Sequence, residues 1–563
     1  MPTPVYDAIV IGSGITGGWA AKELTEKGLN VLVLEAGRTI VPERDYVEHV
    51  PVWELKYRDW DNRAEREKTQ PVQRECYYAC DEYSHKFFVS DAENPYSCAE
   101  GKHFSWIRGR QVGGKSLTWG RQSYRWSDLD FEANLRDGIA VDWPIRYADI
   151  APWYDYVEEF AGISGQLEGL PQLPDGKFLP PMDMTCVEMD VREALAKHFD
   201  DRIMTIGRAA VLTRVHKGRA ACHYCGICHR GCITGSYFSS LSSTLPAAQK
   251  TGRLTLRPYS VVHSLTYDSA TRKISGVRVI DAQSKSALEF QAKIYFLNAA
   301  TLESTRILLN SATTEFPNGL CNSSGELGHN LMDHHMGAGA SGMMPGHEDK
   351  MPFGNRPNGI YIPRFRNVNE KTKQTAFIRG YGYQGGGSRD GWTRGMSMPG
   401  LGADFKKSLR MPGPWRMSVG GFGECLPSHN NYVEIDKGKV DAWGIPTLHI
   451  NCAWGENELA MHKDIGVQGA EMLAAAGARN IMVNQEISSP GLGIHEMGTG
   501  RMGRDPKTSV LNAHNQAHDA KNLFMTDGAC MVSSSCVNPS LTYMALTARA
   551  CDFAVTQLKK NEL

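Results

Sequence analysis

Four cysteines fall within eleven residues in the middle of the chain: Cys222, Cys225, Cys228 and Cys232. Their spacing, C-x2-C-x2-C-x3-C, is the one that bacterial ferredoxins use to hold an iron–sulfur cluster through thiolates. A structural zinc site would place its two cysteine pairs farther apart, so zinc is the weaker fit. A covalently attached haem c is a closer alternative, because Cys225 to His229 reads C-x-x-C-H. That alternative leaves two cysteines unexplained, so segment 222–232 predicts an iron–sulfur site.

The other ten cysteines are scattered along the chain. Unpaired cysteine behaves mostly as a small core residue, so buried free thiols are expected. Cys76, Cys80 and Cys98 are close enough in sequence for a local disulfide to be an alternative.

A histidine and an asparagine near the C-terminus carry the side chains that alcohol oxidation needs. His495 has an ordinary pKa near 6.5 and can take the hydroxyl proton of an alcohol while the C–H hydride leaves. Asn538 can hold the same hydroxyl by a hydrogen bond. Asn538 also stands where a helix N-cap is expected, with Pro539 at the first helical position. The alternative is an ordinary core histidine and an asparagine that only caps a helix.

Such chemistry needs a redox cofactor, and the first 35 residues have the pattern of a dinucleotide site. The strand-like run 6–11 is followed by Gly12, Gly14 and Gly17, then by a helical stretch and a second strand that ends at Glu35. These glycines allow a tight turn, the approach of a pyrophosphate to a helix N-terminus, and close helix packing. The acidic residue would accept hydrogen bonds from a ribose. The motif alone does not separate FAD from NAD.

Three internal segments extend the pattern, and together with the two ends they resemble the glucose–methanol–choline (GMC) oxidoreductases. Residues 108–120 look like the family's second flavin signature, 298–311 like a later FAD-domain helix, and 328–334 like the segment that follows. The family's catalytic pair is a histidine in an H-x-x-G-T element and a histidine or asparagine about forty residues on. His495 and Asn538 match this pair, 43 residues apart.

The resemblance implies FAD as the cofactor. Some members attach FAD through a histidine beside the second signature, but this chain has Ser116-Leu117-Thr118-Trp119 there, so non-covalent FAD is expected. The start of the last helix would place its positive end near a reduced, anionic flavin ring. The expected FAD contacts are Gly12, Gly14, Gly17, Glu35, Arg110, Gly113, Gly114, Ser116, Trp119, Gly120, Val262, Asp527 and Pro539.

Within the family, the cysteine cluster resembles a branch that contains bacterial gluconate, fructose and glucose dehydrogenase large subunits and glucoside 3-dehydrogenases. In that branch an iron–sulfur cluster accepts electrons from the flavin. The branch spacing corresponds to Cys222, Cys228 and Cys232, with Cys225 as an extra thiol, so 3Fe-4S and 4Fe-4S clusters both stay open. The resemblance also implies a small accessory subunit with an export signal and a cytochrome c electron acceptor.

The expected fold class is α/β, with a GMC-type, Rossmann-like FAD-binding domain and an inserted antiparallel-sheet substrate domain. The FAD-binding domain is assigned to residues 1–40, 105–334 and 491–563, and the substrate-binding domain to 41–104 and 335–490. Within the insert, strand-like residues 431–435 and an amphipathic helix over 458–475 are expected. The glycine-rich residues 382–388 are expected to form a loop.

These features predict an FAD-dependent dehydrogenase that oxidises a sugar or glycoside hydroxyl to a carbonyl, with the C3 hydroxyl of glucosides first and gluconate 2- or glucose 1-dehydrogenation as alternatives. An oxidase, and a non-catalytic flavin and iron–sulfur electron-transfer protein, are further alternatives. A nicotinamide-dependent enzyme is disfavoured because such an enzyme requires neither a segment like 108–120 nor a cysteine cluster.

Bulk composition excludes other classes of partner. The 61 basic and 62 acidic residues nearly cancel, so no overall field would attract nucleic acid. No run approaches the roughly 20 apolar residues that span a bilayer. Only residues 1–5 precede the strand-like run 6–11, which is expected to leave no room for an export signal. Periplasmic location by co-export with a partner subunit is expected, with the cytoplasm as the alternative.

Overall fold

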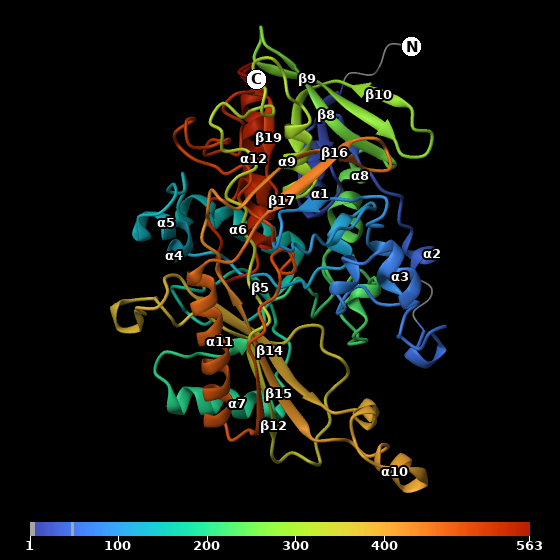
Figure 1. Cartoon of the computed structure of the whole chain (residues 1–563), viewed down its shortest axis with the longest axis vertical. Coiled ribbons are helices and arrows are strands. Elements are labelled where there is room, and N and C mark those ends of the chain that lie inside the picture. The colour runs from blue at the N-terminus through green and yellow to red at the C-terminus, as the bar shows by residue number, and fades with distance from the viewer. Residues whose placement is uncertain (1–5, 47–49) are drawn as a thin grey trace.

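The computed structural model describes residues 6–46 and 50–563. Its elements are arranged around two principal β-sheets, one in the upper half and one in the lower half of Figure 1. The upper sheet is parallel and the lower one antiparallel, and helices pack on both. The predicted α/β fold class is confirmed, because the structure contains both a parallel, Rossmann-like sheet and an antiparallel one.

The five-stranded sheet is parallel throughout. Its inner strands are continuous apolar runs, and the side chains of residues 8–11 and 31–34 are buried. Strands buried on both faces are typical of parallel sheets covered on each side. In spatial order the strands are β19 (Leu523–Met525), β11 (Ala292–Leu297), β1 (Tyr6–Ile11), β2 (Val31–Leu34) and β7 (Leu254–Arg257).

Helices and a small antiparallel sheet pack around the parallel sheet. Helix α1 (Ile15–Glu26) packs against α12 (Ser540–Lys559) and α8 (Leu245–Lys250), and α12 also contacts α6 (Tyr147–Ala161). Strand β8 contacts β2 and α9 (Thr301–Leu309), while β9 contacts β11. The three-stranded sheet is formed by β10 (Ala287–Phe290), β9 (Lys273–Asp281) and β8 (Ser260–Asp268).

The six-stranded sheet is antiparallel and is covered by α11 (Glu456–Ala475) and α7 (Cys186–His198). Its first five strands are β18 (Arg479–Asn484), β12 (Gly339–Met344), β15 (Trp415–Gly423), β14 (Tyr381–Arg389) and β13 (Ile360–Ile362). The sixth, β6 (Thr205–Ile206), pairs with β13. Residues 186–206 therefore pack with this sheet, although they lie within the sequence range 105–334.

The predicted loop at residues 382–388 is wrong, because these residues form most of β14. This strand pairs with β15 from Tyr381 to Arg389. A Cβ at Gly385 would lie 2.0 Å from the carbonyl oxygen of Ser418 on the neighbouring strand. The glycines thus allow close approach of neighbouring chains, a role that composition does not distinguish from a loop.

Two other predictions for the inserted segments are confirmed. Strand β16 (Tyr432–Val440) contains four of the five predicted strand residues, all but Asn431, and α11 contains the predicted helix. A small sheet joins β16 to β17 (Pro446–Asn451) and β3 (Ser97–Cys98). The remaining elements are short: α2 (Pro42–Asp45), α3 (Arg63–Thr69), α4 (Asp128–Phe131), α5 (Ala133–Asp137), α10 (Gly402–Ser408), β4 (Ile163–Ser164) and β5 (Phe178–Leu179).

The predicted N-cap at Asn538 is wrong by one residue. Helix α12 begins at Ser540, Pro539 occupies the N-cap position, and no side chain caps the helix. The Asn538 side chain instead accepts a hydrogen bond from Gln384 on the six-stranded sheet. The asparagine therefore faces the second sheet rather than the end of its own helix.

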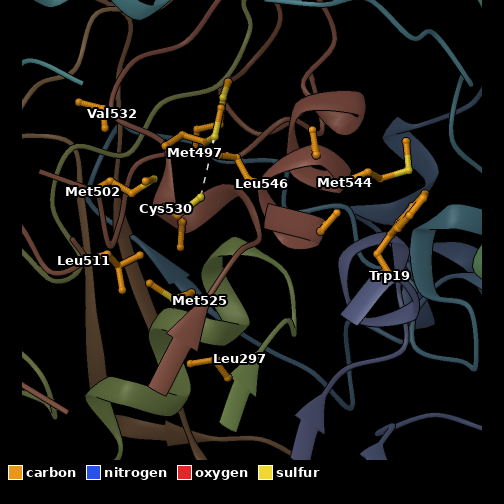
Figure 2. Close-up of a cluster of buried hydrophobic side chains, with 14 of the residues drawn as sticks. Trp19, Leu297, Met497, Met502, Leu511, Met525, Cys530, Val532, Met544 and Leu546 are labelled. Atoms are coloured by element: carbon orange, nitrogen blue, oxygen red, sulfur yellow. Dashed lines mark hydrogen bonds between the residues drawn. The ribbon is translucent and has the colours of Figure 1, made fainter. Parts of the chain in front are cut away.

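The largest core lies beneath α12. Figure 2 shows Met497, Met525, Cys530 and Leu546 converging from separate segments, and all four side chains are fully buried. Met497 lies two residues after His495, so the histidine closely precedes a fully buried core residue. All fourteen cysteines lie in described residues and are free thiols, so the alternative of a disulfide among Cys76, Cys80 and Cys98 is wrong. Along the described residues, no helix combines the length and apolar character that a bilayer span requires.

Candidate functional site

A cavity of about 540 Å³ begins at the carboxyl ends of β1 and β2 and reaches the six-stranded sheet. One end is lined by Gly14 and Glu35, and the other by His495, Asn538 and Gln384. Parallel strands leave their carboxyl ends open for ligands, so a crevice is expected there. The cavity thus joins the predicted nucleotide site to the predicted catalytic pair.

The first glycine turn has the geometry that a nucleotide requires. Gly12 has φ +96°, and a Cβ there would lie 2.4 Å from the carbonyl oxygen of Asn298. A Cβ at Gly17 would lie 1.9 Å from the carbonyl oxygen of Gly12, so any side chain would push α1 off the turn. A Cβ at Gly14 would meet no atom within 4 Å, because this glycine borders the cavity. Gly14 therefore leaves room for a ligand at the start of α1.

Glu35 lies at the end of β2 with its carboxylate in the cavity wall. One oxygen, Oε2, accepts hydrogen bonds from Ser13 N at 3.1 Å and from Ser13 Oγ at 2.5 Å. The other, Oε1, accepts from Gly37 N at 2.9 Å. Burial raises the pKa of Glu35, and the hydrogen bonds from Ser13 and Gly37 oppose that shift. Oε1 accepts a single hydrogen bond and keeps a lone pair, so the carboxylate can still accept a ribose hydroxyl.

The second glycine segment packs on the first. Gly113 N donates to Ser13 Oγ at 3.0 Å, and a Cβ at Gly114 would lie 3.1 Å from Gly14 Cα. Both glycines have positive φ, at +97° and +51°. The Ser116 hydroxyl donates to the Gly113 carbonyl at 2.5 Å, which ties the turn to itself. Segments about 100 residues apart in sequence therefore form one edge of the cavity.

Most of the predicted cofactor residues line this cavity, and three do not. Gly17, Gly113 and Pro539 are buried behind the wall, where they shape or support it. The residues that line it are Gly12, Gly14, Glu35, Arg110, Gly114, Ser116, Trp119, Gly120, Val262 and Asp527, together with His495 and Asn538.

The turn that carries His495 is fixed by a buried carboxylate. Asp333 accepts hydrogen bonds from the backbone N–H groups of Gly491, Gly493 and His495, at donor–acceptor distances of 2.8, 2.9 and 3.0 Å. Burial, and to a lesser extent the nearby Glu496, raise the pKa of Asp333 to about 7. Three N–H donors on one carboxylate hold residues 491–495 in a single conformation.

A second histidine contacts the predicted base. The Nδ1 atoms of His334 and His495 lie 2.8 Å apart, and the two rings meet edge to face with centroids 4.9 Å apart. His334 is fully buried. Across the cavity, Gln384 Nε2 donates to Asn538 Oδ1 at 2.6 Å. His334 and Gln384 therefore set the orientations of the two predicted catalytic side chains.

Unpaired polar atoms in the cavity wall fit a polar cofactor such as FAD. Within residues 6–46 and 50–563, Glu496 Oε1 and the Tyr543 hydroxyl are buried without a hydrogen-bond partner, and both residues line the cavity. Buried polar atoms without partners are costly, and a bound ligand can supply the missing bonds. Asp527, whose pKa burial raises to about 6, lies in the same wall. The glycines in the cavity wall and these polar atoms together fit FAD.

The cysteine segment lies outside the cavity lining but shares a neighbour with it. Cys222, Cys228 and Cys232 pack on a small apolar cluster, and Cys225 is exposed. Trp119 packs on that cluster and also lines the cavity. Burial raises the pKa of Cys228, and the three neighbouring thiols raise it further. In the described part of the chain, however, no three ligand side chains are gathered as a metal-binding group.

Sequence reasoning missed two residues that the structure places at the site. His334 is the last residue of segment 328–334, for which the sequence alone predicts no catalytic role. Gln384 lies in the glycine-rich run that the sequence predicts as a loop. Reading that run as a strand would place alternate residues on one face and would have marked Gln384 as a candidate.

Relatives with assigned activities match over nearly the whole chain. The 2-methyl-1,2-propanediol dehydrogenase of Mycolicibacterium austroafricanum is 29% identical and covers 97% of this chain and 94% of its own length. The fructose dehydrogenase large subunit of Gluconobacter japonicus is 27% identical, with coverages of 99% and 98%. The gluconate 2-dehydrogenase flavoprotein of Pantoea cypripedii is 22% identical, with coverages of 99% and 94%.

Solved structures share the fold. The pyridoxine 4-oxidase from Mesorbium loti superposes with a TM-score of 0.58 at 17% identity, covering 98% of this chain and 99% of its own. A variant of the Aspergillus oryzae formate oxidase gives a TM-score of 0.62 at 13% identity, with both chains fully covered.

Two sequence profiles of one protein family match the chain. Residues 6–336 match the N-terminal profile described as GMC oxidoreductase, and residues 427–547 match the C-terminal profile of the same description. The N-terminal match alone spans more than half of the chain. The chain therefore belongs to the GMC oxidoreductase family, whose members use FAD to oxidise CH–OH groups.

Proposed function

We propose that the protein is a dehydrogenase that oxidises a hydroxyl group of a sugar or glycoside to a carbonyl. The observation that carries this proposal is the single cavity that joins the dinucleotide end at Gly14 and Glu35 to His495 and Asn538. When bound, FAD supplies the acceptor for the hydride that leaves the substrate carbon. The protein has to orient the hydroxyl group and take its proton.

His495 serves as the base in this proposal. Burial lowers its pKa well below the ordinary histidine value, and His334 and Lys115 lower it further. The imidazole is then neutral at neutral pH and can accept the hydroxyl proton. The Asp333 carboxylate accepts a hydrogen bond from the backbone N–H of His495 and so fixes the position of the backbone that carries the ring.

Asn538 serves as the hydrogen-bond donor. Its Oδ1 is occupied by Gln384 Nε2, so its amide N–H groups are the ones left for a ligand in the cavity. A donor is the type of group needed to hold the hydroxyl oxygen while His495 removes the proton. The pair thus divides the two tasks at one C–OH group.

The test is anaerobic reduction of the bound flavin by substrate, followed as bleaching of its visible absorption. His495→Ala is expected to abolish bleaching while FAD content stays at the wild-type level. Asn538→Ala is expected to slow it by about 10²-fold, the loss typical of a missing transition-state hydrogen bond. His329→Ala is the matched control, since His329 stacks on His429 and is not part of the cavity wall. Bleaching at the wild-type rate in His495→Ala would refute the proposal.

The choice of hydroxyl is part of the proposal. Relatives named for a diol, for fructose and for gluconate have substrates in which several carbons bear oxygen. We place the C3 hydroxyl of glucosides first, with gluconate C2 and glucose C1 as alternatives. Turnover of a sugar panel with an artificial electron acceptor, followed by NMR of the product, identifies the oxidised carbon. Peroxide formed in air in proportion to product would favour an oxidase over a dehydrogenase.

For electron exit, we propose an iron–sulfur cluster at residues 222–232. Cys222, Cys228 and Cys232 would hold it, with Cys225 as a fourth ligand if the cluster has four irons. The thiol spacing and the position of Trp119 between these thiols and the cavity support the proposal. Such a cluster would supply one-electron transfer toward a cytochrome-type partner.

Iron and labile sulfide in the purified protein test the cluster, together with low-temperature EPR. Cys228→Ser is expected to lose iron and keep FAD. Cys186→Ser is the control, because Cys186 begins α7 outside this segment. Full iron content in Cys228→Ser, or no iron in the wild-type protein, would refute the cluster without affecting the roles of His495 and Asn538.

We also propose a small accessory subunit with an export signal, a cytochrome c acceptor and a periplasmic location, with the cytoplasm as the alternative. One relative is named as a large subunit, which supports the need for a second chain. Co-expression with and without the candidate subunit, followed by fractionation, tests the location. Substrate-dependent reduction of cytochrome c tests the acceptor.

A further inference from the structure

We infer that His334 is a positioning residue that sets the tautomer of His495, so that the bare Nε2 nitrogen of His495 faces the cavity. This inference rests on the proposed function, in which His495 is the base. It follows from three groups that lie in contact: the Ser535 carbonyl, His334 and His495.

The first contact fixes the proton on His334. Its Nε2 atom lies within hydrogen-bond distance of the Ser535 carbonyl oxygen. A carbonyl oxygen can only accept, so Nε2 must carry the hydrogen and donate it. A neutral imidazole carries one N–H, which leaves Nδ1 of His334 as an acceptor.

The second contact decides which ring nitrogen of His495 carries the hydrogen. The two Nδ1 atoms lie 2.8 Å apart, a distance that requires one hydrogen between them. His334 Nδ1 has none to give, so His495 Nδ1 donates. His495 then has no hydrogen on Nε2, and a bare nitrogen is what a base needs in order to take a hydroxyl proton.

Burial keeps this arrangement in one state. His334 is fully buried, and burial lowers its pKa to about 4, so its ring is neutral at neutral pH. If His334 gained a second proton, its Nδ1 would become a donor and could no longer accept from His495. The surroundings also hold the ring in place, with Phe422 edge-on at a centroid distance of 6.4 Å.

The same contact couples the two halves of the catalytic pair. Ser535 lies three residues before Asn538, within a buried stretch that continues into α12. Ser534 anchors this stretch, because its hydroxyl donates to the Cys425 carbonyl at 2.8 Å. His334 therefore links the ring of His495, through two hydrogen bonds, to the backbone segment that carries Asn538.

The direct test is histidine-ring NMR of the holoenzyme labelled with ¹⁵N-histidine, with the His495 signals assigned by their loss in His495→Gln. The expected spectrum shows hydrogen on Nδ1 of His495 and none on Nε2. A hydrogen on His495 Nε2 in the resting enzyme would overturn the inference, and this measurement does not depend on any variant of His334.

Two variants of His334 separate the effect of losing the hydrogen-bond acceptor from the effect of altered packing. His334→Phe keeps an aromatic ring but removes the acceptor, so His495 should populate both tautomers. The rate of flavin reduction by substrate should fall between about 10- and 10⁴-fold, the upper figure being the cost of a wrongly held tautomer in a serine protease triad. KM and FAD content should change little. His334→Gln keeps an acceptor and a donor and should stay within about tenfold of the wild-type rate.

His335→Gln is the matched control, because His335 is also fully buried but contacts His462 instead of His495. It should lower stability and leave the His495 nitrogen signals unchanged. Unchanged His495 signals and an unchanged reduction rate in His334→Phe would overturn the inference. If His495→Ala still reduces its flavin normally, the proposed function fails, whatever tautomer the NMR spectrum shows.

Discussion

At the level of single residues, the proposed chemistry depends on a histidine that must stay neutral. His495 is kept below its ordinary pKa by burial, by His334 and by Lys115, while Asp333 and Glu496 lie close to the same turn. Hydrogen bonding to Asp333 involves only the backbone N–H of His495, so that carboxylate fixes position without making the ring more basic. The imidazole is thus neutral at neutral pH, the state that the proposed role as a base requires.

The pH dependence of the substrate-reduction rate follows from this. A lowered pKa means that the ring takes a proton only well below pH 6.5, so loss of the base should lower the rate only there, and any change between pH 7 and 6 should come from Asp333, whose pKa is about 7. The reduction rate, measured by stopped flow from pH 4 to 8 with FAD content checked at each pH, tests this. A rate that shows no fall down to pH 4 would contradict the assignment of His495 as the base.

A second residue-scale prediction concerns Gln384. A carboxylate in its place can only accept, so in Gln384→Glu the Asn538 amide should rotate to donate to it and turn its oxygen toward the cavity. The reduction rate should fall by at least about tenfold, because the donor for the hydroxyl oxygen is lost. Gln384→Leu, which leaves the amide free to adopt either orientation, should lose less. Equal rates in wild type and Gln384→Glu would remove Gln384 from this role.

At the scale of elements, the first turn contains two glycines with different tasks. Gly17 is packed against the Gly12 carbonyl, whereas Gly14 borders open cavity. The strand–turn–helix pattern was predicted correctly because local spacing determines it: β1, α1 and β2 fall where the apolar runs and glycines indicate. The glycine-rich β14 was not predicted, because its glycines serve neighbouring strands rather than a turn.

This difference makes Gly14→Ala and Gly17→Ala a matched pair. Gly17→Ala should destabilise the protein by about 1–3 kcal/mol, the usual cost of overpacking, and should loosen FAD binding as well. Gly14→Ala should cost the FAD-free protein less, about 0.5–1 kcal/mol, because alanine is a poorer N-cap than glycine but its Cβ meets no atom within 4 Å, and should weaken FAD binding by about tenfold or more. Thermal unfolding of the FAD-free proteins and FAD titration measure the two effects. Equal loss of stability in both variants would contradict this division.

At the scale of the whole molecule, the cavity lies where two sheets meet, so its ligand should hold them together. Residues of β14 and β15, such as Gln384 and Phe422, share the wall with residues that follow β1 and β2. A ligand that binds only the folded state stabilises it, by about 2.7 kcal/mol when its concentration is 100 times the dissociation constant.

Removal of FAD should therefore lower the melting temperature and increase proteolysis of segments that face the cavity. Adding FAD back should restore both in a concentration-dependent way, while NAD should restore neither. Differential scanning fluorimetry and limited proteolysis of the two forms test this. A melting temperature that does not change when FAD is added would mean that FAD does not bind in this cavity.

Short spacings in the sequence were enough to predict the glycine-rich turn and the family, and they supplied the residue types that we propose for the base and its partner. These depend on spacings of a few residues, which backbone geometry translates directly into turns, helices and strands. The sequence also predicted the α/β class correctly.

Only the tertiary structure decided which side chains meet. His334 and His495 are 161 residues apart in sequence, and Gln384 and Asn538 are 154 apart. The physical reason is that such contacts are created by the packing of whole sheets and by buried carboxylates such as Asp333, and no local periodicity in the sequence encodes them.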